Sequence, residues 1–251
     1  MERRRRMAGR TWWNAAWAVV ALMAIAQRGH GQAVAEAKPA FTVTSQNDPS
    51  KPVPGGVRWF GREHQKCLAR TRAKDFEMCL LGDSITAMWP GDLFNKYFGR
   101  YRAANFGIGG DRCENVLWRL QQGELAGTSP KLIMLLIGTN NQGMNTAEEV
   151  AWGVGLVVKR LREVCPESKI LLVGILPSRG TPYAKTKQIN EATAKLADGA
   201  TVRFIDPGLK MLTEDETVEA GVLSDSVHLT PKGYAIWGDG TAEIVAEMMG
   251  Q

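Results

Sequence analysis

Short apolar runs alternate with segments of helical character along most of this chain of 251 residues. The apolar runs lie at 77–82, 102–106, 132–138, 169–176 and 201–205. The helical segments lie at 91–98, 112–122, 146–164, 185–198 and 231–248. Such alternation favours a parallel sheet covered by helices on both faces, because parallel strands are joined through helical crossovers. The sequence therefore predicts an α/β fold, a three-layer α/β/α sandwich around a five-stranded parallel sheet.

Two of the expected helices carry start signals. Thr146 precedes an Ala-Glu-Glu sequence that ends at Glu149, which is the spacing of a capping box. Thr230 is followed by Pro231, a cap with proline at the first helical position. A further segment, 62–73, is charged and predicts a surface helix, in which we expect His64 to face solvent.

The first 35 residues differ from the rest of the chain. They hold six arginines and one acid, and an unbroken apolar run covers residues 15–26. A bilayer span takes about 20 residues, so this run better fits the hydrophobic core of a secretory signal peptide. Ala33-Val34-Ala35 offers a cleavage site. We therefore expect a signal peptide at 1–35 and a secreted or periplasmic product, with an uncleaved membrane anchor or a basic tail after a mis-assigned start codon as alternatives.

The charge of the remaining chain argues against a nucleic-acid partner. The formal net charge is +5, but beyond residue 35 the chain holds 25 basic and 25 acidic residues. A basic patch for nucleic acid would need an excess of Lys and Arg on the folded part. Residues 36–57 contain four prolines and two glycines among polar residues, which predicts an extended linker. We expect the folded domain at 58–251, without stable membrane insertion after cleavage.

Four cysteines remain in the expected mature chain: Cys67, Cys79, Cys113 and Cys165. An even number permits two disulfides in an exported protein. However, Cys79 lies inside an expected strand and Cys165 at a helix end, where small buried thiols are common. We expect mostly free cysteines and leave their pairing open. The spacing matches no zinc pattern, so neither a metal nor another cofactor is expected.

A candidate nucleophile follows the first expected strand, which ends at a Gly-Asp-Ser sequence whose serine is Ser84. Open α/β sheets place their sites at the carboxyl ends of the strands. The serine needs a base, and His30 leaves with the signal peptide while His64 is expected on the surface. His228 remains, with Asp225 three residues before it to orient the imidazole. Taken alone, these last two residues fit a helix-entry loop; together with Ser84 they favour nucleophilic catalysis.

Candidate oxyanion donors follow the next two strands. Gly109 and Gly110 come after the second strand, and glycine lets backbone N–H groups approach a ligand closely. Asn140 comes after the third strand and carries a side-chain amide. Taken singly, each of these residues fits a turn. Because the three strand ends share one edge of the sheet, we expect an oxyanion hole formed by the Ser84 and Gly110 N–H groups and the Asn140 amide.

These segments resemble the sequence blocks of the SGNH hydrolase superfamily, also called GDSL esterases. The resemblance implies a flavodoxin-like fold, with Ser84 as the nucleophile and Asp225 and His228 as the Asp-x-x-His pair. It also implies that Gly110 and Asn140 are oxyanion donors.

One stretch of the chain carries a closer resemblance. Residues 105–120 are similar to the catalytic subunits of the intracellular platelet-activating-factor acetylhydrolases and to their bacterial relatives. The likeness runs from about residue 58 to 249. The expected export signal differs from those intracellular enzymes, so their phospholipid substrate does not transfer directly.

The sequence thus predicts an exported serine esterase that hydrolyses carboxylic esters with short acyl groups through an acyl-enzyme. Acetyl esters of carbohydrates are the leading substrates. A lipase or lysophospholipase and a catalytically idle carbohydrate-binding module are the alternatives. An α/β-hydrolase is rejected because Gly-x-Ser-x-Gly is absent around Ser84. A dinucleotide loop is rejected because residue 112 is arginine rather than glycine. The oligomeric state stays open, a homodimer included.

Overall fold

The computed structural model of the protein describes residues 42–251, so the predicted signal peptide at 1–35 lies outside the described residues. Residues 43–251 form one unit built on a parallel sheet with strand order β2-β1-β3-β4-β5. The strands are β1 (Met78–Gly82), β2 (Ala103–Gly107), β3 (Leu132–Leu136), β4 (Lys169–Val173) and β5 (Val202–Ile205). The predicted five-stranded parallel sheet is confirmed, and each strand falls on one of the apolar runs.

Seven α-helices flank this sheet in the described part of the chain. They are α1 (Phe60–Ala73), α2 (Ser84–Ala87), α3 (Gly91–Phe98), α4 (Cys113–Gln121), α5 (Ala147–Val164), α6 (Tyr183–Ala194) and α7 (Pro231–Met249). Three short 3₁₀ helices, η1 (Gly99–Tyr101), η2 (Thr139–Asn141) and η3 (Pro207–Met211), lie in the connections.

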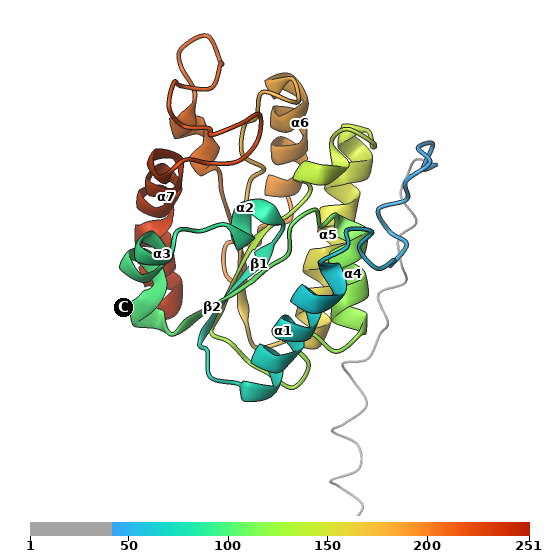
Figure 1. Ribbon diagram of the computed structural model, residues 1–251, viewed down its shortest axis with the longest axis vertical. Helices are drawn as coiled ribbons and strands as arrows, with labels where there is room; N and C mark the ends of the chain where they lie inside the picture. Colours follow the sequence, from blue (N-terminus) through green and yellow to red (C-terminus); the bar gives the residue numbers. More distant parts are fainter. Residues whose placement is uncertain (1–41) are drawn as a thin grey trace, which may run out of the picture. The chain divides into compact units, whose positions relative to one another are not determined.

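The two faces of the sheet support separate halves of the core. Cys79 and Leu81 of β1 belong to a buried cluster that includes side chains of α1, α4, α5 and α6. Met78 and Leu80 point the other way, into a cluster with α3 and α7. Figure 1 shows the same division, with α3 and α7 on one side and α1, α4 and α5 on the other. Because both faces are covered, β1 and β3 are buried throughout, as their continuous apolar runs require.

Two glycines allow the chain to pass closely over the ends of β1 and β2. A Cβ at Gly82 would lie 2.3 Å from the carbonyl oxygen of Leu136 and from Thr86 Oγ1. A Cβ at Gly107 would lie 2.3 Å from the backbone nitrogen of Ala87. Only glycine fits at these places, so α2 can pack directly on the strand ends. The chain moves from β1 to β2 on one side of β1 and then continues with β3 on its other side. Open α/β folds build their sites where the strand order reverses in this way.

Both predicted helix caps are confirmed. Thr146 Oγ1 accepts a hydrogen bond from the Glu149 N–H at 3.2 Å, and Glu149 Oε2 accepts one from the Thr146 N–H at 3.1 Å. Thr230 accepts from the Gly233 N–H at 3.3 Å, and Pro231 is the first residue of α7.

The prediction that His64 faces solvent is wrong. The residue is 4% exposed, and its side chain lies on the inner face of α1 with Phe60 and Cys67. These positions recur every three or four residues, which is the buried stripe of a helix. The charged residues between them hid this stripe in the sequence. Glu124 contacts the buried ring, with its Oε2 3.2 Å from His64 Nδ1.

The prediction of an extended linker at 36–57 needs a correction over its described part. Residues 44–53, here called the strap, contain no helix or strand, but they are bound to the domain. The Thr44 N–H donates to Glu149 Oε1 at 2.8 Å, and Asn145 Oδ1 accepts from Asn47 Nδ2 at 3.0 Å. Val53 donates through its backbone to the Glu114 carbonyl at 3.3 Å. The folded domain therefore includes the strap and begins ahead of residue 58.

All four cysteines in the described chain are buried and free of disulfides. Burial raises the pKa of the Cys67 thiol to about 12 and the pKa values of Cys79 and Cys113 well above their usual range. Between residues 42 and 251, no helix is both long and apolar enough to cross a membrane.

Candidate active site

Ser84 is the first residue of α2 and lies two positions after the last residue of β1. The preceding residue, Asp83, caps this short helix, because its Oδ1 accepts from the Ile85 N–H at 2.9 Å. Asp83 is completely buried, and this burial raises its pKa to about 6 although the Ile85 N–H favours the charged form. The cap fixes the turn that presents the Ser84 hydroxyl at the strand end.

The structure brings Ser84, His228 and Asp225 together, as predicted, although the serine and the histidine are 144 positions apart. His228 Nε2 lies 3.0 Å from Ser84 Oγ, and His228 Nδ1 lies 2.6 Å from Asp225 Oδ2. An ionised carboxylate can only accept hydrogen bonds, so Nδ1 carries the proton. In the neutral ring Nε2 is then free to accept the Ser84 proton.

Asp225 is fixed by the loop that leads into α7. Its Oδ1 accepts from the backbone N–H groups of His228 at 2.7 Å and Val227 at 2.8 Å. The His228 N–H, the His228 imidazole and the Val227 N–H together hold the pKa of the Asp225 carboxyl well below its usual range. The carboxylate is therefore ionised and oriented toward the imidazole at neutral pH.

The turn after β2 lies beside the serine. A Cβ built on Gly109 would be 3.8 Å from Ser84 Cβ and 3.4 Å from Trp59 Nε1. Gly110 has a φ of +85°, a left-handed conformation that favours glycine. Trp59 Nε1 donates to the Gly109 carbonyl at 3.2 Å, and a Cβ on Gly110 would lie 3.0 Å from Val57 Cγ1. The glycine pair is thus held between Ser84 and the chain segment that enters α1.

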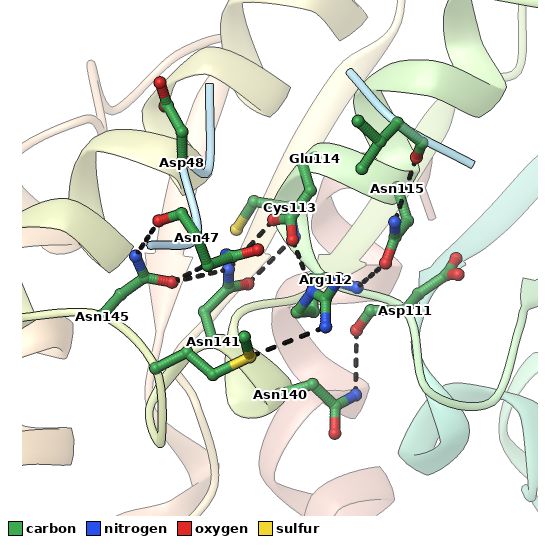
Figure 2. A network of polar contacts seen from close by, with 12 residues as sticks. Asn47, Asp48, Asp111, Arg112, Cys113, Glu114, Asn115, Asn140, Asn141 and Asn145 are labelled. Atoms are coloured by element: carbon green, nitrogen blue, oxygen red, sulfur yellow. Dashed lines mark hydrogen bonds and ion pairs between the residues drawn. The ribbon is translucent and has the colours of Figure 1, made fainter. Parts of the chain in front are cut away.

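Asn140 lies in η2, which is separated from the end of β3 by two residues, and its side chain is fixed by the turn that contains the glycines. Its Nδ2 donates to the backbone carbonyl of Asp111 at 2.9 Å (Figure 2). A side-chain amide has two N–H donors, so one remains for a ligand. Asn140 is half-buried.

A series of buried charges lies next to this turn, and it was not predicted from the sequence. Arg119 Nε lies 3.1 Å from Asp111 Oδ2, and its Nη1 lies 3.3 Å from Glu124 Oε1. Arg119 also donates twice to the Phe106 carbonyl, at 3.0 and 3.1 Å. Burial raises the pKa of Asp111 to about 7, and Arg119 opposes that shift. Charged residues on the otherwise apolar inner face of α4 were the available signal.

Three further residues near the site, one exposed and two buried, were not predicted from the sequence. Trp59 is 41% exposed beside Gly109, at the point where the linker was expected to end. Asn141 and Glu114 are buried and hydrogen-bonded to each other between η2 and α4. Across residues 42–251, no cluster of three or more His, Cys, Asp or Glu side chains is arranged to hold a metal ion.

A flavodoxin-like sheet that carries a serine, a histidine and an aspartate in one hydrogen-bonded series has the arrangement of a serine-dependent acyl hydrolase. The chain belongs to the GDSL-like Lipase/Acylhydrolase family, whose profile matches residues 80–236. The predicted membership of the SGNH or GDSL group is confirmed, and the protein is an ester hydrolase of this type.

Known proteins support this assignment. The chain is 34% identical over 199 residues to human platelet-activating factor acetylhydrolase IB subunit alpha1, a match that covers 75% of this chain and 85% of that protein. Its fold is similar to a GDSL-like lipase from Bacteroides thetaiotaomicron, with a TM-score of 0.61, 18% identity and coverage of 73% and 97% of the two chains. A carbohydrate acetylesterase from Sinorhizobium meliloti gives a TM-score of 0.53, 18% identity and coverage of 68% and 98%.

Proposed function

We propose that this protein is an exported serine esterase that removes short acyl groups, above all acetyl, from carbohydrate esters. The observation that carries the proposal is the hydrogen-bonded series from Ser84 Oγ through His228 to Asp225. The acetyl preference is supported by the relatives named as acetylhydrolases, and the carbohydrate by a structural neighbour named as a carbohydrate acetylesterase. The exposed indole of Trp59 beside Gly109 adds a flat apolar face at the site.

The proposed reaction begins when Ser84 Oγ attacks the ester carbonyl carbon and His228 Nε2 takes the serine proton. Asp225 holds the imidazole in the required tautomer and stabilises its positive charge. Collapse of the tetrahedral intermediate releases the alcohol, which receives the proton from His228, and leaves the acyl group on Ser84. A water molecule, deprotonated by His228, then attacks the acyl-enzyme and releases the acid.

The charge on the carbonyl oxygen develops only in the transition state, so preorganised donors there accelerate the reaction. We assign this role to the backbone N–H groups of Ser84 and Gly110 and to the second N–H of the Asn140 amide. The hydrogen bond from Asn140 to the Asp111 carbonyl orients that amide before substrate binds.

Export is the part of the proposal that rests on sequence alone. Residues 1–35 carry the arginines, the apolar run and the Ala33-Val34-Ala35 site of a signal peptide. The mature chain should begin near Glu36, which amino-terminal sequencing of the exported protein would reveal. Recovery of residues 1–35 intact in a membrane fraction would favour an anchor instead.

The activity is tested with p-nitrophenyl esters of increasing acyl length and with acetylated sugars. We expect kcat/KM to be highest for acetate and to fall as the chain lengthens, and we expect acetylated sugars to release acetate. Ser84→Ala should lose activity by a factor on the order of 10³ or more and keep its fold. A preference for long acyl chains would favour a lipase, and the absence of turnover would favour a binding module.

A further inference from the structure

Two of the donors of the oxyanion hole proposed above, Gly110 and Asn140, come from loops whose strands do not pair with each other directly. Gly110 follows β2, whereas Asn140 follows β3, and β1 lies between these two strands. Strand pairing therefore relates the two loops only indirectly, through β1, which pairs with both strands. Contacts between the loops, of which the bond from Asn140 to the Asp111 carbonyl is one, help to set the distance between the two donors.

Asn141, the residue after Asn140, bridges these loops and is 0% exposed. Its Oδ1 accepts from the backbone N–H of Cys113, the first residue of α4, at 3.0 Å. Its Nδ2 donates to Glu114 Oε2 at 3.1 Å and to Asn145 Oδ1 at 3.2 Å. Figure 2 shows the side chain between the two segments, with Asn140 reaching the Asp111 carbonyl beside it.

The groups that Asn141 binds are themselves held in place. Glu114 is 1% exposed, and its other oxygen pairs with Arg112 Nε. Asn145 donates to Glu149 Oε2 at 3.0 Å. The Asn141 side chain therefore binds groups that are themselves fixed, and its polar atoms bond to the protein rather than to solvent.

We propose that Asn141 is a positioning residue for the hydrolytic reaction, which holds the Asn140 amide at the correct distance from the Gly110 N–H. The inference rests on the oxyanion roles proposed for those two residues. Oxyanion donors act at about 2.7–3.1 Å from the developing charge. A displacement of about 1 Å in such a site can cost 10²-fold in rate, so loss of the bridge acts on kcat without removing a donor.

The test compares Asn141→Ala with a matched control elsewhere in the fold, Asn190→Ala. Asn190 is also buried, at 4% exposure, and also makes three side-chain hydrogen bonds. It accepts from the Ile175 N–H at 2.8 Å and donates to the Ile175 carbonyl at 3.0 Å and to Asp206 Oδ2 at 2.8 Å. These bonds do not reach either oxyanion loop. Asn190→Ala therefore measures what the loss of a buried, hydrogen-bonded asparagine does to stability and kcat when the oxyanion loops are not involved.

We expect both variants to lower the melting temperature. In Asn141→Ala, kcat for p-nitrophenyl acetate should also fall by about 10- to 100-fold with KM little changed, whereas Asn190→Ala should keep its kcat. Asn141→Ser, which leaves less empty volume, should show the same kcat loss and serves if the alanine variant does not fold.

A double substitution separates this inference from the proposed function. If Asn141 acts through Asn140, then Asn141→Ala should cost clearly less in an Asn140→Ala background than in the native protein. An unchanged kcat in Asn140→Ala would overturn the proposed oxyanion role itself. A reduced kcat in Asn140→Ala, combined with native kcat in the Asn141 variants or with fully additive losses, would overturn only the positioning role.

Discussion

At the scale of single residues, Asp225 shows how an exposed carboxylate can be held in one orientation beside an imidazole. Its side chain is 53% exposed, yet two backbone N–H groups and the His228 ring hold it. These donors favour the ionised form, so the pKa of Asp225 lies below its usual range. Its role follows from its acceptor-only chemistry, since a carboxylate leaves the imidazole no alternative tautomer.

We therefore expect Asp225→Asn to lower kcat/KM by a factor on the order of 10²–10⁴. The new amide can donate to Nδ1, which moves the ring proton to Nε2 and blocks acceptance of the Ser84 proton. Steady-state kinetics with p-nitrophenyl acetate would measure the loss, and circular dichroism would check the fold. Activity close to that of the native protein would show that Asp225 does not control the tautomer.

The sequence predicts the residues that meet at strand ends better than the residues that support them. Ser84, Gly110 and Asn140 follow apolar runs, and the topology of a parallel sheet brings such positions to one edge. Asn141 was missed because an asparagine in a turn has many ordinary explanations. His64 was wrongly placed because the charged residues of α1 hide the buried stripe that it shares with Phe60 and Cys67.

At the scale of elements, Glu149 joins the start of α5 to the strap. It completes the capping box with Thr146 and also accepts from the Thr44 N–H and from Ser45 Oγ. Burial raises its pKa, but hydrogen bonds from Asn145, Ser45, Thr44 and Thr146 outweigh that effect and lower it to about 2. A capping residue visible in the sequence thus has a second task that the sequence does not show.

This arrangement predicts a pH-dependent contribution to stability. A lowered pKa means that the folded state favours the carboxylate, so the contribution is present above the ordinary pKa of 4.5 and is lost as the pH falls toward about 2. Glu149→Gln should lower the free energy of unfolding by roughly 1–3 kcal/mol at neutral pH. The difference from the native protein should shrink between about pH 4.5 and 2 in urea titrations.

The exposed neighbour Glu148 offers a control on the same turn of α5. Glu148→Gln should leave the free energy of unfolding almost unchanged. A Glu149→Gln effect that did not vary with pH would show that the charge of Glu149 is not what binds the strap.

At the scale of the whole molecule, the sheet was predictable because its strands fall on apolar runs, which in β1 and β3 are continuous and covered on both faces. The strap was not, because it has a linker's composition and binds through hydrogen bonds and through one buried proline, Pro49, beside Gly153 of α5. The proposed cleavage after Ala35 leaves the strap intact.

Two shortened chains can therefore be compared, one that begins at residue 36 and keeps the strap and one that begins at residue 54 and lacks it. We expect the chain without the strap to have a melting temperature several degrees lower than the chain that keeps it. The second chain loses the bonds to Glu149, Asn145 and Asn115. Differential scanning calorimetry would compare the two. Equal melting temperatures would show that the strap adds no stability.

The central claim is that Ser84 is the nucleophile activated by His228. An organophosphate such as diisopropyl fluorophosphate tests it directly, because the attacking serine oxygen bonds to phosphorus as fluoride leaves. We expect mass spectrometry to find one adduct, on Ser84, formed in proportion to the loss of esterase activity and slowed by a factor on the order of 10³ in His228→Ala. Inactivation with Ser84 unmodified, or full activity with Ser84 labelled, would contradict the account.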